Sequence, residues 1–464
     1  MPDTGGGSPA PMAVPVVPIA VPVVEDKPPS LIHHRDFRQL WIGDTASQLG
    51  AALGSLAIPY LAVTALHATA FQMGLLSTLS GLGFLVIGLP AGAIVDRRSK
   101  RRVMIAADLG RAALLAGLPL MWWLDALTLA QVMAVATLIG MLTVFFDVAY
   151  QSYLPFLVPD DQVVEGNAKL QASQSVSQSA GPAVGGLLLR TVGPPTVIVL
   201  NAAGFVVSAL FLHRIRHREV AADPQDRQPL RREIVEGLRF VLGHPLLRRL
   251  IACTAIGNFT SSIGASLAVL YMIDDLHLSA FTIGVVDSAA AVGGLAGALL
   301  ATAIARRIGE GPSIVLTAIA VAVLTFANPL AAVLPAVATL IVGGVFAMAS
   351  IVAYNIATVS FRQRLCPPEL LGRMNASARF LVWGTIPLGA MTGGLMGSHL
   401  GVMATMWVAA SLGCLAVLPV ASRAVWRMKK LPEHDDVAAA PGDLPATPAA
   451  IVVVSGDGPR SPAR

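Results

Sequence analysis

"GAIVDRRSKRRV", residues 92–103, places a dense cluster of charge between two long apolar runs. From Gln72 to Val95 the chain has no charged side chain, and then Asp96 is followed by cations at five of the next six positions. A second apolar run begins at Val103. Apolar runs of about twenty residues can each cross a bilayer core of roughly 30 Å as a helix. The stretch therefore indicates a short polar loop between two membrane spans.

The composition of the whole chain favours the same class of protein. Of 464 residues, 55% are hydrophobic and only 13% are charged, and the mean hydropathy is +0.70. A soluble chain of this length needs more charge to cover its surface. Three cysteines show no spacing typical of a disulfide framework or a metal site. We expect an all-α integral membrane protein without a metal or other cofactor.

Recurring apolar runs predict twelve transmembrane helices, with the charged loops deciding their direction. Basic residues gather in alternate loops, and Arg190 is the only Lys or Arg in the opposite set. Basic loops stay in the cytoplasm, so we expect a multi-pass cell-membrane protein with both termini inside. The same rule explains the net charge of +5 without nucleic acid. The predicted spans are 38–65, 72–95, 103–123, 128–150, 168–190, 194–214, 248–272, 281–304, 313–333, 337–361, 375–399 and 402–424.

A long polar segment after the sixth span divides the chain into two six-helix bundles. Residues 31–214 form the first bundle and 248–430 the second, while 1–30 and 431–464 are Pro-rich tails that we expect to be disordered in the cytoplasm. Within the linker 215–247, apolar residues recur at helical spacing among charges. This pattern predicts an amphipathic helix on the inner membrane surface; a solvated linker helix fits it equally well.

The two bundles carry an internal repeat. A shift of 208 residues superposes "VPDDQVVEGNAKLQ" (158–171) on "CPPELLGRMNASAR" (366–379), and the same shift brings Gly185–Gly186 onto Gly393–Gly394. A shift of 209 brings Arg97–Arg98 onto Arg306–Arg307. Two homologous six-helix halves are typical of transporters that rock around a central site.

These features resemble the major facilitator superfamily over about residues 36–425, and within it the bacterial twelve-span drug and macrolide efflux branch, which includes siderophore exporters. The opening stretch is similar to that superfamily's loop between spans two and three, Gly-x-x-x-Asp-Arg-x-Gly-Arg-Arg, although Ser99 replaces the usual Gly and Lys100 the usual Arg. "FRQLWIGDTASQLG", "ADLGRA" and "YLPFLVPDDQVVEGNA" also look like this branch. The residues matching the loop motif are Gly92, Asp96, Arg97, Lys100 and Arg101.

The resemblance implies roles for two of these motifs. Asp96 is implied to face the start of span eleven and to latch the two halves together on the cytoplasmic side; a plain topology signal is the alternative. "GPAVGG" (181–186) is similar to the span-five signature of antiporters, with Ser177 where an upstream Gly is usual. Its residues Gly181, Pro182, Gly185 and Gly186 more readily explain close helix packing than ligand binding.

Ionisable residues inside membrane spans are costly and are candidates for function. Asp108 and Arg111 lie three apart on one helical face, and with Asp147 we interpret them as structural ion pairs, Asp147 meeting Lys100 or Arg101. Asp44 and Asp287 have no partner evident in the sequence. A carboxyl group in an apolar site can exchange a proton near neutral pH, so Asp44 first and Asp287 second are our proton-coupling candidates. Snorkelling to the interface is the alternative for both.

The family resemblance implies a substrate cavity between spans one, four, seven and ten, to which span five adds three glutamines. Its apolar walls suit a lipophilic organic molecule. Polar residues there serve equally well as interhelix hydrogen-bond partners. The candidates are Gln48, Tyr60, Gln171, Gln174, Gln178, Asn258, Phe259, Tyr354 and Asn355.

We therefore expect a secondary transporter, not an enzyme: a monomeric proton antiporter that exports a lipophilic small molecule, with the proton gradient as its energy source. An uptake symporter of the same fold is the nearest alternative. A membrane enzyme acting on lipid is disfavoured because no His–Asp or Cys–His cluster lies deep in a span, and a nucleotide-driven pump because no G-x-x-x-x-G-K-[ST] occurs.

Overall fold

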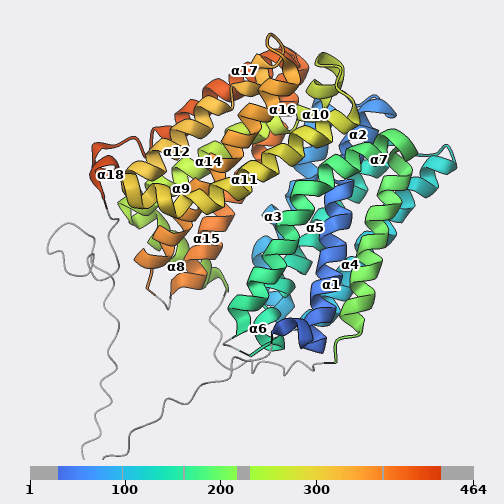
Figure 1. Cartoon of the computed structure of the whole chain (residues 1–464), viewed down its shortest axis with the longest axis horizontal. Coiled ribbons are helices and arrows are strands. Elements are labelled where there is room, and N and C mark those ends of the chain that lie inside the picture. The colour runs from blue at the N-terminus through green and yellow to red at the C-terminus, as the bar shows by residue number, and fades with distance from the viewer. Residues whose placement is uncertain (1–29, 97, 160–161, 217–229, 368–369, 430–464) are drawn as a thin grey trace, which may run out of the picture.

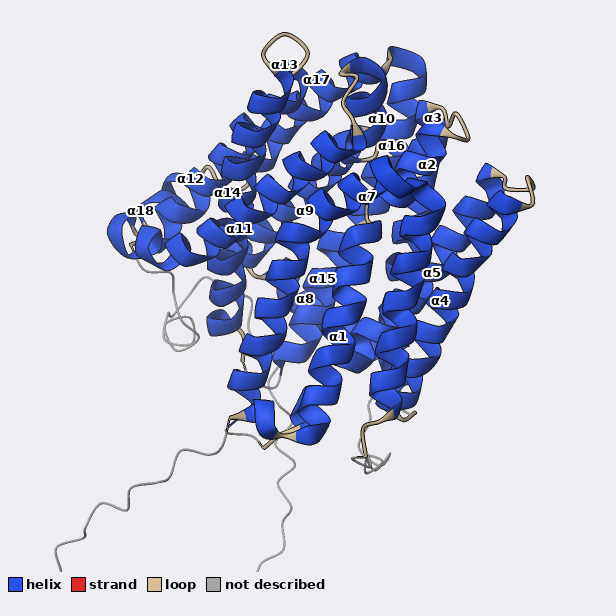
Figure 2. Ribbon diagram, turned by 45° about the vertical axis from the view of Figure 1, so that its right-hand side comes forward, coloured by secondary structure: helices blue, strands red, loops and turns tan. Residues whose placement is uncertain are grey.

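The computed structural model describes residues 30–96, 98–159, 162–216, 230–367 and 370–429. Over these ranges the chain is helical, and it has no β-strand (Figure 2). The predicted tails and most of Arg216–Leu230 lie outside them. The first half comprises α1 (Arg35–Gly54), α2 (Ala57–Thr64), α3 (Ala70–Asp96), α4 (Lys100–Trp123), α5 (Leu129–Gln151), α6 (Leu154–Leu157) and α7 (Val163–His213), preceded by a short 3-10 turn at Leu31–His33.

The second half follows a separate helix, α8 (Leu230–Gly243). Short 3-10 or π turns at Tyr271–Asp275 and Cys414–Val417 extend two of its helices. Its helices are α9 (Pro245–Ala265), α10 (Ala268–Leu270), α11 (Ala280–Ile308), α12 (Glu310–Leu324), α13 (Ala327–Leu330), α14 (Ala336–Leu365), α15 (Leu371–Trp383), α16 (Thr385–Leu400), α17 (Val402–Gly413) and α18 (Arg423–Arg427).

Ten helical segments in the described chain are long and apolar enough to cross a membrane, and Val402–Val417 is a shorter apolar helix. One of the ten, Glu165–His213, has 49 residues, which at 1.5 Å per residue is about 74 Å, far longer than one crossing needs. Gly193 breaks it with a φ of 80°, followed by Pro194 and Pro195. Each part then matches one predicted span; the total of twelve stays a prediction.

Helix contacts reproduce the sequence repeat in space. A Cβ atom added to Gly181 would lie 2.3 Å from the Ala52 Cβ of α1, and one added to Gly389, 208 positions later, would lie 2.2 Å from the Phe259 carbonyl oxygen of α9. Real Cβ atoms do not approach this closely, so both sites need glycine. The first and second halves therefore pack their helices in the same pattern.

The same pattern joins the two halves to each other. A Cβ added to Gly186 of α7 would lie 2.3 Å from the Ala280 carbonyl oxygen of α11. One added to Gly394 of α16 would lie 2.8 Å from the Gly74 Cα of α3. The α7–α11 and α3–α16 crossings thus bring backbone against backbone, as small residues permit between membrane helices.

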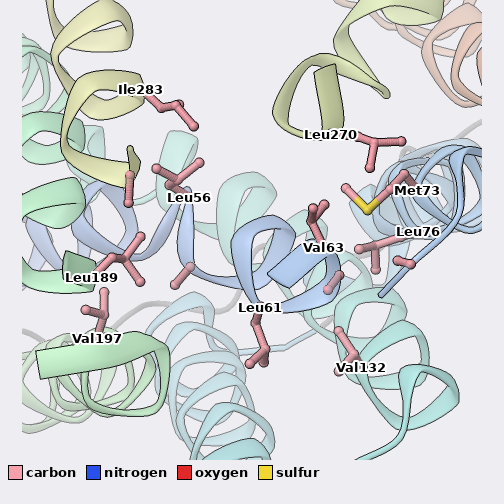
Figure 3. Packing of buried hydrophobic residues seen from close by; sticks show 14 of the residues in the cluster. Leu56, Leu61, Val63, Met73, Leu76, Val132, Leu189, Val197, Leu270 and Ile283 are labelled. Carbon is pink, nitrogen blue, oxygen red and sulfur yellow. The ribbon is translucent and has the colours of Figure 1, made fainter. Parts of the chain in front are cut away.

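These crossings close one end of the molecule, which we call the distal end; it contains the α16–α17 and α4–α5 connections. One buried apolar cluster there includes residues of both halves. Figure 3 shows Leu270 and Ile283 of the second half among side chains of the first, including Leu56, Leu61 and Met73. The distal end is therefore sealed by a shared apolar core.

The opposite, basal end contains the start of α1, the ends of α3 and α5, and the start of α15. Its buried clusters each belong to one side: one around Phe37 and Tyr153 in the first half, and one around Leu247 and Phe361 in the second. The ribbons of the two halves meet near the top of Figure 1 and lie apart near the bottom, around α6 and α8. The buried apolar core that the two halves share therefore lies at the distal end, whereas the basal clusters are separate.

Helix α8 packs against α15, whereas its place at the inner membrane surface stays a prediction. Val241 is fully buried in a cluster with Met374 and Ala378. The Arg373 Nη1 donates to Glu236 Oε2 at 2.5 Å. Amphipathic spacing predicts the apolar face of such a helix but not which surface covers it, and here the covering surface is protein.

Replacing Gly237 with leucine is expected to separate α8 from α15. A Cβ at Gly237 would lie 2.4 Å from Ser377 Oγ and 2.5 Å from the Arg373 carbonyl oxygen, and overpacking of this kind costs about 1–3 kcal/mol. We expect a lower thermal unfolding midpoint in detergent. Gly243→Leu is the matched control, because no atom lies within 4 Å of a Cβ at that end of α8. Equal midpoints for the two variants would contradict the docking.

Candidate functional site

A cavity of about 750 Å³ lies between the two halves, below the distal seal. Residues of α1, α3, α4, α5 and α7 form most of its lining, and Ala265, Trp383 and Pro387 contribute from the second half. This volume is within the range of sites that take drug-sized molecules. The wall is mainly apolar, with Gln48, Gln174 and a few charged groups exposed to the cavity.

Asp44 is buried on α1, where only 3% of its surface is exposed; it is not in the cavity lining, but it lies one helical turn before Gln48, which is. Its Oδ1 has no hydrogen-bond partner among the described residues. The side chains of Tyr150 and Gln48 approach its carboxyl group, and the carboxyl groups of Asp108 and Asp147 lie within electrostatic reach. Asp44 is thus part of a group of acids from α1, α4 and α5.

Arg111 is the cation at the centre of this group. Its Nη2 forms an ion pair with Asp108 Oδ1, both side chains being at most 5% exposed, and its Nη1 lies 3.4 Å from Thr143 Oγ1. The guanidinium also lies over the rings of Phe146 and Phe205, at 4.4 and 4.2 Å from their centroids. Such stacking suits the planar guanidinium of arginine.

Asp147 lies on α5 at the cavity wall and has partners other than those expected. Arg111 and Arg379 are the cations within its electrostatic reach. Lys100 instead lies 4.1 Å from the Phe156 ring centroid, and Arg101 donates to the Ile215 carbonyl oxygen. The cations that act electrostatically on Asp147 are therefore Arg111 and Arg379, not the expected Lys100 or Arg101.

The arrangement places three carboxyl groups around the buried Arg111, with Arg379 as a second cation that acts on Asp147. Ionising Asp44, Asp108 and Asp147 together would place an excess of negative charge in a poorly solvated region, which is costly. Sharing a proton among the acids lowers that cost, and such coupled acids titrate as a set. The site can therefore hold a proton next to a cavity of substrate size.

Seven of the predicted cavity residues are not in its lining. Tyr354 is buried within the second half, where its hydroxyl lies 3.0 Å from Thr254 Oγ1. The Asn258 amide donates to the Val382 carbonyl oxygen at 3.0 Å. Tyr60 packs against the distal apolar cluster. The residues outside the lining are Tyr60, Gln171, Gln178, Asn258, Phe259, Tyr354 and Asn355.

Asp287, the second proton-coupling candidate, is apart from the acid group. It is exposed on α11 and is not in the cavity lining. At 100° per residue it lies about 140° around the helix from Val292, which is one of the exposed apolar residues of α11. Asp287 thus faces away from that apolar side of α11 and lacks the neighbours that Asp44 has.

The predicted cytoplasmic latch falls on a part of the chain that is not described. Arg97 lies outside the described residues, and the surroundings of Gly92 and of the Asp96 side chain are not described, whereas Lys100 and Arg101 are. The latch stays a prediction.

Sequence reasoning left Tyr150, Phe84 and Trp383 unassigned and gave Arg379 no role. The Phe84 and Trp383 rings lie 5.0 Å apart, and both line the cavity. These residues come from α3, α5 and α15, which are far apart in sequence. No local spacing brings them together; only the family resemblance, which implies that the end of span two faces the start of span eleven, could have suggested it.

Known proteins are similar to this chain in sequence and in architecture. The model of the Major Facilitator Superfamily matches residues 40–384 and 252–458. The multidrug efflux pump Tap of Mycolicibacterium fortuitum is 30% identical over 389 residues, covering 80% of this chain and 91% of that protein. The macrolide efflux protein A of Streptococcus pyogenes is 28% identical over 203 residues, covering 44% and 50%.

Solved structures agree with the fold. A bacterial homologue of the iron transporter ferroportin, in an inward-facing state, has a TM-score of 0.69 at 16% identity, covering 84% of this chain and 98% of that one. The nucleoside transporter NupG has a TM-score of 0.68 at 14% identity, covering 83% and 98%. With the expected helical bundle, the repeat and the central cavity all present, the chain is a membrane transporter that belongs to the Major Facilitator Superfamily.

Proposed function

We propose that this transporter exports lipophilic small molecules in exchange for protons, by alternating access. It lies in the cell membrane, and its basal end and both termini face the cytoplasm. The observation that carries the proposal is the buried acid group beside the cavity. Asp44 is 3% exposed with an unpartnered Oδ1, and the cavity of about 750 Å³ is mainly apolar. Relatives named as efflux pumps support export, and basic basal loops support the orientation.

Proton exchange at Asp44 follows from its surroundings. The titratable groups that face it are Tyr150 and Asp147 of α5 and Asp108 of α4, with Arg111 behind them. A proton on Asp44 reduces the excess negative charge, and an arriving substrate or a change in access to water would alter that balance. A monomer is sufficient for this mechanism, since both halves of the cavity come from one chain.

Asp44→Asn is expected to lower gradient-driven transport roughly tenfold or more, because the amide keeps the shape of the carboxyl group but cannot exchange a proton at an intramembrane site. Inside-out vesicles with an acidic lumen and a fluorescent lipophilic dye give the measurement. An exporter concentrates dye in the lumen as protons leave, whereas an uptake symporter moves dye outward with protons.

Asp125→Asn is the matched control, because Asp125 is exposed in the α4–α5 connection, and its transport should equal that of the parent. Asp287→Asn, tested in parallel, should have the smaller effect. Undiminished gradient-driven export by the Asp44→Asn protein would contradict the proposed role of Asp44 in proton exchange.

A further inference from the structure

Arg379 of the second half reaches the first half below the cavity. It lies one helical turn before Trp383 on α15, towards the basal end. Its guanidinium is 4.7 Å from the Trp383 ring centroid and 5.2 Å from that of Phe84 on α3. Its Nη1 lies 3.5 Å from Gln151 Oε1 at the end of α5. One side chain thus connects three helices across the boundary between the halves.

The two rings that hold Arg379 also form part of the cavity wall. Phe84 and Trp383 line the cavity, whereas Arg379 does not. The order from the distal seal to the basal end is therefore cavity, aromatic pair, then guanidinium. On the α3–α15 side the arginine and the two rings lie between the cavity and the basal solution.

Besides these uncharged partners, Arg379 has a group of opposite charge within reach. Asp147 lies on the cavity wall, and its carboxyl group interacts electrostatically with Arg379 and with Arg111. The rings and the Gln151 amide hold the cation by weak, separable contacts, whereas a carboxylate can hold it as an ion pair. Closure of the basal end would bring α15 towards α5 and strengthen the contact with Asp147.

The internal repeat shows that only the second half has a cation at this position. The position equivalent to Arg379, 208 residues earlier, is Gln171 on α7, which is exposed. A neutral amide offers neither a cation for aromatic rings nor an ion pair for a carboxylate. The charge at Arg379 is therefore not required by the shared architecture.

We propose that Arg379, held between Phe84 and Trp383 and against Gln151, is a gate residue that restricts access to the cavity from the basal end. The proposal rests on alternating access as the proposed function. Its test needs neither a substrate nor a proton gradient, so its failure is distinguishable from a failure of the proton-coupling experiment.

The test measures access to the cavity directly. A cysteine at Ala51, which is exposed and lines the cavity, is introduced after the three native cysteines are replaced. Inside-out vesicles are treated with a membrane-impermeant maleimide, and the labelling rate is measured. Arg379→Ala should raise that rate roughly tenfold, equivalent to about 1.4 kcal/mol in the closing equilibrium. Phe84→Leu and Trp383→Leu should raise it as well, and Arg379→Lys should fall between Arg379→Ala and the parent.

Two controls separate gating from misfolding and from orientation. Arg373→Ala removes an arginine of the same helix that contacts Glu236 of α8, and it should leave Ala51→Cys labelling unchanged. A cysteine at Asn167, exposed at the basal start of α7, should label at one rate in all variants. If Arg379→Ala labels within twofold of the parent while these controls hold, Arg379 is not a gate residue.

Discussion

Replacing Gly394 with leucine is expected to leave the protein inserted but unable to close its distal end, so that transport is lost. The Cβ alone would lie 2.8 Å from the Gly74 Cα and 3.0 Å from the Phe71 carbonyl oxygen. These atoms are backbone and cannot turn aside as a side-chain tip can. Relieving the clash requires α16 to move away from α3, and this movement opens the shared apolar core.

The size of the effect follows from the cost of overpacking. A penalty of about 3 kcal/mol, at the upper end for such substitutions, changes the ratio of distally closed to distally open molecules by roughly a hundredfold. Gly394→Ala should give a smaller shift in the same direction. Because a transporter must visit both states, trapping it distally open should stop turnover even where substrate binding persists.

Electron-electron distance measurements can report this shift. Spin labels at Ala126 and Val333, which are exposed in distal connections of the first and second halves, should move apart in the Gly394→Leu protein. Gly117→Leu is the control, because no atom lies within 4 Å of a Cβ there. An unchanged distance distribution together with normal transport would show that the α3–α16 crossing tolerates a side chain.

Replacing Arg111 with methionine is expected to cause the largest loss of stability among the charged residues. The substitution leaves Asp108 with 0% side-chain exposure and no cation, and it removes one of the two cations that act on Asp147. Breaking a buried ion pair by removing one partner costs about 3–5 kcal/mol. We expect a much lower yield of monodisperse protein and a lower unfolding midpoint in detergent.

A second substitution tests the reason for that loss. In the Arg111→Met/Asp108→Asn protein the unpaired charge of Asp108 is gone, so part of the stability should return. The control Lys169→Ala breaks the ion pair of Lys169 with Glu165. Both side chains are partly exposed, so this loss should be much smaller than that of Arg111→Met. Additive losses in the Arg111→Met/Asp108→Asn protein would mean that Asp108 and Arg111 do not stabilise each other.

Features that depend on local spacing were predictable from the sequence. Hydropathy placed several helices within a few residues, as with 103–123 against the observed Lys100–Trp123, whereas the predicted span 402–424 is helical only over Val402–Val417. The repeat anticipated the paired glycine contacts. The spacing of Asp108 and Arg111 anticipated their ion pair, because three residues on a helix bring side chains to one face.

Features that depend on how helices meet were not predictable in this way. Gln171, Gln174 and Gln178 share a helical face, yet Gln174 alone among them lines the cavity, because spacing gives a direction but not where neighbouring helices leave space. We predicted that Asp147 pairs with Lys100 or Arg101 of a nearby loop. Arg379, which acts on Asp147, instead comes from a helix more than 200 residues away in the sequence. The covering of α8 by α15 was missed for the same reason.

The glycine crossings at Gly186–Ala280 and Gly74–Gly394 also bear on the ease of motion. Interlocked side chains must change rotamer or withdraw before two helices can turn on each other, but backbone surfaces meeting at a glycine have little to interlock. Two such contacts join the halves at equivalent positions of the repeat. Each offers little resistance to the rotation of one helix against the other. In the proposed alternating access, the backbone crossings themselves would need no rotamer change, whereas the shared apolar core of the distal end would have to unpack.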